Sequence, residues 1–95
     1  MNKVIIIGSG IGSLSTAIRL KAKGFDVEVF EKNSSPGGKL STIEIGKYRF
    51  NTGPSLFTMP HFVDELFEIL DENPREHFNY IKKDITCRYF WVGNP

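Results

Sequence analysis

The residues that most clearly suggest chemistry are glycines near the start of the chain. Gly8 and Gly10 stand between a β-branched run and a stretch with helical periodicity, and Gly12 is an additional glycine. A glycine-rich turn between a strand and a helix lets backbone N–H groups at the positive helix end approach a pyrophosphate. We therefore expect Gly8 to make the turn and Gly10 to leave room for phosphates. Ser13 stands where a third glycine is usual, and it is small enough to be tolerated.

An acidic residue stands where a dinucleotide site needs one. Glu31 lies 23 residues beyond Gly8, at the end of the next predicted strand. An acid at this position hydrogen-bonds ribose hydroxyls, and its charge would repel a 2′-phosphate. The alternative is an accidental glycine turn that binds nothing. Such a turn would not explain why a strand precedes it, a helix follows it and an acid stands at the end of the next strand. The combination therefore predicts dinucleotide binding.

Three predicted elements position these residues. Residues 4–7 form a short β-branched run typical of a strand buried on both faces of a parallel sheet. Apolar residues then recur at helical spacing from Ile11 to Ile18, and Gly24 supplies a C-cap. Residues 25–30 restore a strand with alternating valines. The order strand, helix, strand makes a βαβ unit and predicts an α/β fold of the Rossmann type.

A loop and a hairpin are expected next. Residues 33–38 combine Asn, Ser, Pro and Gly, which are the residue types of loops. Apolar and polar residues then alternate over residues 43–50 around Gly46. Glycine at the first turn position suits a type II′ turn, so this stretch predicts a β-hairpin.

The last part of the chain predicts a helix and a further strand. Pro60 suits the first position of a helix whose apolar residues extend to Leu70. The pair at residues 73–74, Asn followed by Pro, would end that helix and cap a brief one over residues 75–78. Residues 85–92 are rich in aromatic residues and strand-like. Residues 1–95 together predict an incomplete domain, because a mononucleotide-binding half needs at least a third parallel strand.

Composition narrows the classes of function. The 95 residues carry 12 basic and 11 acidic side chains and a formal charge of +1, and the basic residues are scattered, which disfavours a nucleic-acid partner. The single cysteine, Cys87, cannot make an internal disulfide, and no cluster of metal ligands is present in the sequence. The apolar run at residues 4–7 is too short for a signal peptide or a membrane span. We therefore expect a cytoplasmic protein.

Histidines and aromatic residues have ordinary explanations beside functional ones. His61 and His77 have no Asp, Ser or Cys partner at a motif spacing, so surface or packing positions are favoured. Several aromatic residues could line an apolar substrate channel, although aromatic residues in strands more often belong to a core: Tyr48, Phe50, Phe57, Tyr89, Phe90 and Trp91.

Two further motifs follow the glycine turn. The first is the Gly-Gly motif Pro36-Gly37-Gly38-Lys39, and the second is the Asn-x-Gly stretch Phe50-Asn51-Thr52-Gly53-Pro54-Ser55. In this order the motifs resemble those of the FAD-dependent oxidoreductases that include amine oxidases and phytoene desaturases, whereas ordinary NAD-dependent dehydrogenases lack the last two. Residues 51–60 with the following Asp64-Glu65-Leu66-Phe67 resemble the phytoene desaturase or carotenoid dehydrogenase branch. The resemblance covers almost the whole chain.

The resemblance implies FAD as cofactor and a role for each motif. The pyrophosphate turn would be lined by Gly8, Gly10, Ile11, Gly12 and Ser13. Glu31 would hold the adenosine ribose, and the second motif would pass along phosphates and flavin through Gly38, Lys39 and Leu40. The third motif would approach the isoalloxazine through Gly53, Pro54 and Ser55. Lys39 departs from the commoner arginine and supplies a point charge without the planar fork, and Asn51 stands where the family often has Asp.

The implied activity is desaturation of a carotenoid or other polyisoprenoid, with an apolar polyene as substrate and hydride transfer to the flavin. No catalytic residue can be named within the chain. Residues 1–95 would be the N-terminal part of the FAD-binding domain, inactive alone, while a substrate domain and any peripheral membrane contact would lie outside this chain. Two alternatives stay open. One is a non-catalytic FAD-binding remnant or interaction module, and the other is a different FAD chemistry such as amine oxidation or retinoid saturation.

Overall fold

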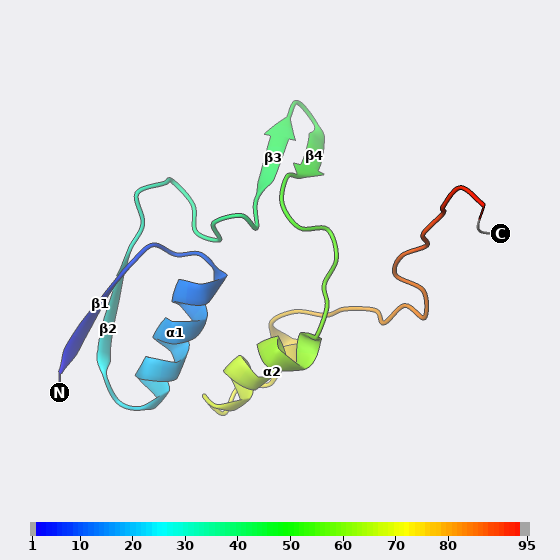
Figure 1. Cartoon of the computed structure of the whole chain (residues 1–95). Helices are drawn as coiled ribbons and strands as arrows, with labels where there is room; N and C mark the ends of the chain where they lie inside the picture. The colour runs from blue at the N-terminus through cyan, green and yellow to red at the C-terminus, as the bar shows by residue number, and fades with distance from the viewer. Residues whose placement is uncertain (1, 94–95) are drawn as a thin grey trace.

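The computed structural model describes residues 2–93 and begins with the predicted βαβ unit. Strand β1 (Lys3–Ile7) leads through the glycine turn into helix α1 (Ile11–Ala22), which is followed by strand β2 (Asp26–Phe30). The strands pair in parallel, with Lys3 opposite Asp26 and Ile7 opposite Phe30. Figure 1 shows α1 beside this pair. The predicted α/β unit is confirmed.

Helix α1 covers only one face of the two-stranded sheet. Val4 and Ile6 of β1 are half-buried, as are the valines of β2. On the opposite face Ile5 is 57% exposed, Ile7 87% and Phe30 50%. The predicted burial of β1 on both faces is therefore wrong for this chain, because no element within residues 2–93 covers the second face.

A β-hairpin follows the loop after β2. Strand β3 (Thr42–Ile45) pairs antiparallel with strand β4 (Tyr48–Asn51), with Ile45 opposite Tyr48. Gly46 adopts a φ of 61° at the first turn position, and Lys47 is not among the residues with positive φ, which is the pattern of the predicted type II′ turn. The hairpin stands apart from the parallel sheet (Figure 1).

The predicted helices form a second unit beside α1. Helix α2 (Pro60–Glu68) is followed by a 3-10 turn, η1 (Pro74–Glu76), whose N-cap Asn73 accepts a hydrogen bond from the Arg75 N–H at 3.0 Å. Leu66 on α2 is the buried hydrophobic residue of the described chain, 7% exposed. An ion pair of 3.1 Å joins Arg19 of α1 to Glu65 of α2. Little apolar surface is thus buried within residues 2–93.

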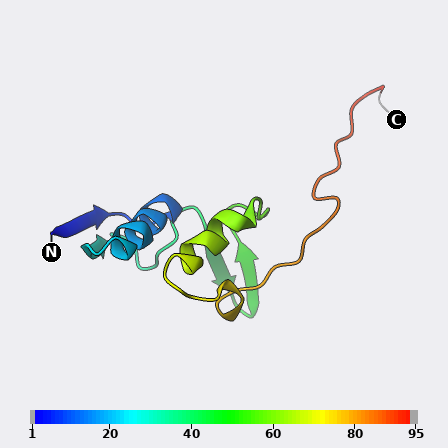
Figure 2. The same ribbon diagram turned by 90° about the horizontal axis from the view of Figure 1, so that it is seen from below.

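The predicted strand at residues 85–92 is absent, and that prediction was wrong for this structure. The segment runs as irregular backbone away from the helices (Figures 1 and 2). A strand requires a partner for its backbone groups, and no described segment pairs with this one. The structure measures 61 × 32 × 27 Å and its radius of gyration is 17.5 Å, against about 13 Å for a closed domain of this size. Within residues 2–93 no helix has the length and apolar character that crossing a membrane requires.

Candidate dinucleotide-binding site

The turn between β1 and α1 presents backbone N–H groups to open space. Gly8 has a φ of 99°, and its N–H donates to the Phe30 carbonyl at 2.7 Å, which ties the turn to the end of β2. Helix α1 starts after Gly10, and in the described chain no side chain caps this helix end. The first N–H groups of α1 therefore keep the partial positive charge that favours a phosphate.

The glycines at the start of α1 have no packing role within the described chain. A Cβ atom at Gly10 or Gly12 would meet no described protein atom within 4 Å. The space above the turn is therefore free to receive a ligand. Ser13 lies beside the turn, since its Oγ would be 3.7 Å from a Cβ placed on Gly8, an ordinary contact distance.

The Gly-Gly loop lies directly against this turn. The Gly37 N–H donates to the Ser9 carbonyl at 2.8 Å, and Gly10 and Gly37 form a parallel β-bridge. A Cβ on Gly38 would lie 3.1 Å from the Gly10 Cα. The second motif can therefore lie this close to the first because Gly38 carries no side chain at the contact.

The third motif contacts the second in the same way. A Cβ on Gly53 would lie 1.8 Å from the Lys39 carbonyl oxygen. The junction is also hydrogen-bonded, since the Thr52 N–H donates to the Ser41 carbonyl at 3.0 Å and the two hydroxyls lie 2.7 Å apart. Backbone contacts thus connect the glycine turn, the Gly-Gly loop and the end of β4.

Glu31 lies at the end of β2 and reaches across to the glycine turn. Its Oε1 accepts hydrogen bonds from the Ser9 N–H at 2.9 Å and the Ser9 Oγ at 2.7 Å. Its Oε2 accepts the Asn33 N–H at 3.0 Å. The Asn33 N–H, followed by the Ser9 bonds, lowers the pKa of Glu31 from 4.5 to about 2. The carboxylate is therefore ionised at neutral pH.

The number of bonds that Glu31 already makes limits what it can offer a ribose. A carboxylate accepts about four hydrogen bonds, two on each oxygen. Oε1 is saturated by Ser9, whereas Oε2 accepts one bond from Asn33. In this arrangement Oε2 has capacity for one hydroxyl, and a second ribose contact would require Ser9 to release Oε1.

Two hollows lie beside the connected motifs. One, of about 310 Å³, is lined by Ser9, Leu14, Glu31 and the residues that follow β2. The other, of about 420 Å³, is lined by Leu40 and Pro54 with polar side chains that include Arg49. The uncapped start of α1, the ionised Glu31 and the glycines that face open space are all present here. These residues fit a dinucleotide.

The structure thus brings together most of the residues that the sequence singled out. The turn, Glu31 and residues 38–40 are connected, and Gly53 joins them through Lys39. Pro54 lines the hollow beside Leu40. Ser55 lies apart, on the wall of another cavity.

Sequence reasoning missed the residues that orient the acid. Ser9, which is 4% exposed, supplies two bonds to Glu31, and Asn33 supplies the third. Ser9 stands between the first two glycines, so its position in the motif could have marked it. Arg49 had no motif signal, because only the folded hairpin carries it to the hollow.

Comparison with known proteins gives relatives for almost the whole chain. A 1-hydroxycarotenoid 3,4-desaturase from Flavobacterium sp. (strain P99-3) is 58% identical over 91 residues, which make up 96% of this chain and 18% of that protein. A 4,4'-diaponeurosporene oxygenase from Staphylococcus haemolyticus (strain JCSC1435) is 38% identical over 91 residues, again 96% of this chain and 18% of that protein. The chain therefore spans less than a fifth of the length of these relatives.

A solved structure supports the fold. The crystal structure of an oxidoreductase from Methanosarcina mazei superposes with a TM-score of 0.56 at 29% identity, over 67% of this chain and 17% of that one. Relatives named as carotenoid and phytoene desaturases confirm the resemblance drawn from the motifs. The family model described as "NAD(P)-binding Rossmann-like domain" matches residues 6–72, well over half of the chain. The chain therefore belongs to the family of NAD(P)-binding Rossmann-like domains.

Proposed function

We propose that this chain is the FAD-binding segment of a longer flavoprotein that desaturates a carotenoid or related polyisoprenoid. The observation that carries the proposal is the uncapped start of α1, with open space at Gly10 and Gly12 and the Gly-Gly loop held against it. A pyrophosphate would accept hydrogen bonds from the free N–H groups there. FAD is favoured over a nicotinamide dinucleotide because the second and third motifs, which are typical of FAD-dependent oxidoreductases, assemble on this turn.

The chain's own residues would bind and orient the cofactor. The turn from Gly8 to Ser13 would hold the pyrophosphate, and the free lone pair on Glu31 Oε2 would accept one adenosine ribose hydroxyl. Residues 38–40 would follow the phosphates toward the flavin, where Gly53, Pro54 and Ser55 would approach the ring. Bound FAD supplies the hydride acceptor that desaturation needs. We assign no catalytic residue within the chain.

We also propose that residues 1–95 are the N-terminal part of the cofactor domain. The open face at Ile5, Ile7 and Phe30 supports this, since both faces of a parallel sheet are normally covered. The polyene-binding domain would then lie in the rest of the protein. An apolar polyene partitions into membranes, so we place the intact protein at the cytoplasmic membrane surface and its membrane contacts outside this segment.

A second candidate reaction is oxygenation of the polyene, favoured by the 38% identical relative that is named as an oxygenase. Both reactions would use the same dinucleotide segment. Mass spectrometry of the product separates them, because desaturation removes two hydrogens from the polyene and oxygenation adds oxygen.

The decisive experiment uses the intact gene product, meaning the longer protein that we propose contains this segment. The purified protein should show a flavin spectrum and release FAD on denaturation. Gly10→Val should purify without flavin, because the branched side chain would fill the space that the phosphates need. Lys21→Val introduces the same side chain at the exposed far end of α1 and should retain flavin. A colourless parent protein, or Gly10→Val with full flavin content, would refute the proposal.

A further inference from the structure

A cavity of about 660 Å³ begins at the last residue of the third motif, Ser55. It is lined by the segment that leads from Ser55 into α2 and by the segment that begins at Tyr80. Its walls are mainly apolar and include Leu56, Phe57 and Ile81. The volume falls within the range of about 300 to 1,000 Å³ typical of small-molecule sites.

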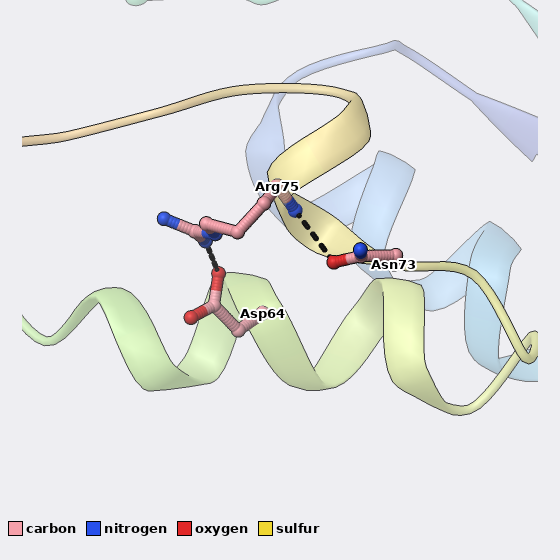
Figure 3. A network of polar contacts seen from close by, with 3 residues as sticks. All are labelled: Asp64, Asn73 and Arg75. Carbon is pink, nitrogen blue, oxygen red and sulfur yellow. Dashed lines mark hydrogen bonds and ion pairs between the residues drawn. The ribbon is translucent and has the colours of Figure 1, made fainter.

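Aromatic packing fixes the shape of this cavity. The rings of Phe57 and Tyr80 meet edge to face at 5.6 Å, which joins the two walls. The Arg75 guanidinium lies 4.5 Å from the centre of the Tyr80 ring. Figure 3 shows how Arg75 is held, with its side chain on Asp64 of α2 and its N–H on the Asn73 side chain. Arg75 therefore holds the Tyr80 side of the cavity against α2.

Backbone strain is found on the opposite wall of the cavity, in the segment that leads from Ser55 into α2. Met59, the N-cap residue of α2, has a φ of 51°, a conformation that residues other than glycine seldom adopt. Its side chain lines the cavity and is 57% exposed. Strained residues of this kind concentrate at ligand-binding sites. The aromatic residues here are not a closed core either, since Phe57 is 48% exposed and Tyr80 39%.

The charges and location of the cavity indicate its occupant. None of the described residues that line it carries a carboxylate; its lysines are Lys82 and Lys83, and His61 also lies on the wall. Lysine covers apolar surface with its aliphatic stem and keeps its ammonium in water. Ser55 belongs both to the cavity wall and to the motif that we propose to approach the flavin. An apolar ligand in this cavity would therefore lie next to the end of the third motif, and beside the flavin ring if that motif approaches the ring as proposed.

We propose that this cavity holds part of the polyene substrate, with Leu56, Phe57, Met59, Tyr80 and Ile81 as its contact surface. The inference rests on the proposed function and adds a substrate-binding surface to a segment otherwise assigned to the cofactor. The bound portion is neutral and apolar, so the two lysines contribute little to its affinity.

The test fills the cavity without disturbing the cofactor site. Leu56→Trp adds bulk to a wall residue that is 51% exposed, so the larger side chain can be accommodated without repacking a core. Ile45→Trp is the matched control, because Ile45 is 61% exposed on the hairpin and outside the cavity lining. Both variants are made in the intact gene product. Flavin content, kcat/KM for the polyene, and induced circular dichroism of the bound polyene are measured.

Leu56→Trp should keep parental flavin content while kcat/KM falls roughly tenfold or more and the induced dichroism is lost. Ile45→Trp should match the parent in all three measurements. Leu56→Trp with parental polyene binding would overturn the cavity assignment and leave the proposed function standing. A parent that binds neither flavin nor polyene would overturn both. Replacing Lys82 and Lys83 with Gln should change polyene affinity less than threefold, and a larger loss would indicate an anionic ligand instead.

Discussion

The Gly53→Ala substitution tests whether the third motif is fixed by backbone contact. The added Cβ would lie 1.8 Å from the Lys39 carbonyl oxygen and 2.9 Å from its carbonyl carbon. Real Cβ atoms essentially never approach within 3.0 Å, and both neighbours are backbone atoms that cannot rotate away. The end of β4 and the Gly-Gly loop would have to separate by roughly 1 Å.

The expected cost follows from what this separation disturbs. Forcing an extra methyl group into a tight contact costs about 1 to 3 kcal/mol. The two hydrogen bonds between Ser41 and Thr52 lie next to the contact, and weakening either would cost about 1 kcal/mol. We therefore expect Gly53→Ala to lower the free energy of unfolding by about 2 to 4 kcal/mol, a large part of the 5 to 15 kcal/mol typical of a domain.

The assay is denaturant unfolding of the intact gene product without cofactor, with Gly12→Ala as the paired variant. Gly12 lies in the first turn of α1, where a Cβ meets no described protein atom within 4 Å. Alanine there should leave the unfolding midpoint unchanged or raise it, since alanine favours helix over glycine by about 1 kcal/mol. Gly12→Ala should instead weaken flavin binding. If Gly53→Ala unfolds at the parental midpoint, the close approach to Lys39 is refuted.

Three further predictions concern single side chains. The hydrogen bonds that lower the pKa of Glu31 to about 2 stabilise the fold above about pH 4.5, and this contribution disappears as the pH falls toward 2. The melting temperature should therefore fall more steeply between pH 4.5 and 2 in the parent than in Glu31→Gln. Parallel curves of melting temperature against pH would contradict the assigned bonds. Met59→Asn should raise the unfolding free energy by about 1 kcal/mol, because Asn tolerates positive φ, while polyene affinity falls. Arg75→Lys should lower the free energy of unfolding in denaturant melts by about 1 kcal/mol, because Lys keeps the charge near Asp64 but loses stacking on Tyr80. An unchanged midpoint would contradict the role of Arg75 in holding Tyr80 against α2.

Local patterns predicted the elements whose stabilising contacts are near in sequence. The βαβ unit required only periodicity and a glycine turn, and its second strand pairs with the first after a single helix. The hairpin required only alternation around Gly46. Residues 85–92 had strong strand propensity, yet propensity places a residue in a sheet only where a partner strand exists. That prediction failed because the sequence of a strand does not contain its partner.

The candidate site was predicted as a set of motifs, and the structure adds the contacts between them. The order of the glycine motifs indicated a shared ligand, but no spacing rule predicts that Gly53 packs on Lys39 or that Gly38 packs on Gly10. Nor does the sequence show that Ser9 occupies part of the acceptor capacity of Glu31. Such contacts depend on how two loops meet in space, and residues far apart in the chain decide them.

Two kinds of glycine can now be separated at the site. Gly38 and Gly53 face other backbone segments, so their missing side chains allow the protein to assemble. Gly10 and Gly12 face open space, so no contact within the described chain requires them to be glycine. A substitution of the first kind should act on folding and only indirectly on the cofactor, whereas one of the second kind should act on the cofactor alone. The hydrophobic core contributes little to this geometry, because Leu66 is the buried hydrophobic residue within residues 2–93 and lies on α2, away from the glycine turn. The shape of the candidate site therefore depends mainly on backbone contacts and on the Ser9–Glu31 hydrogen bonds, which explains how it can form beside a sheet whose second face is still open.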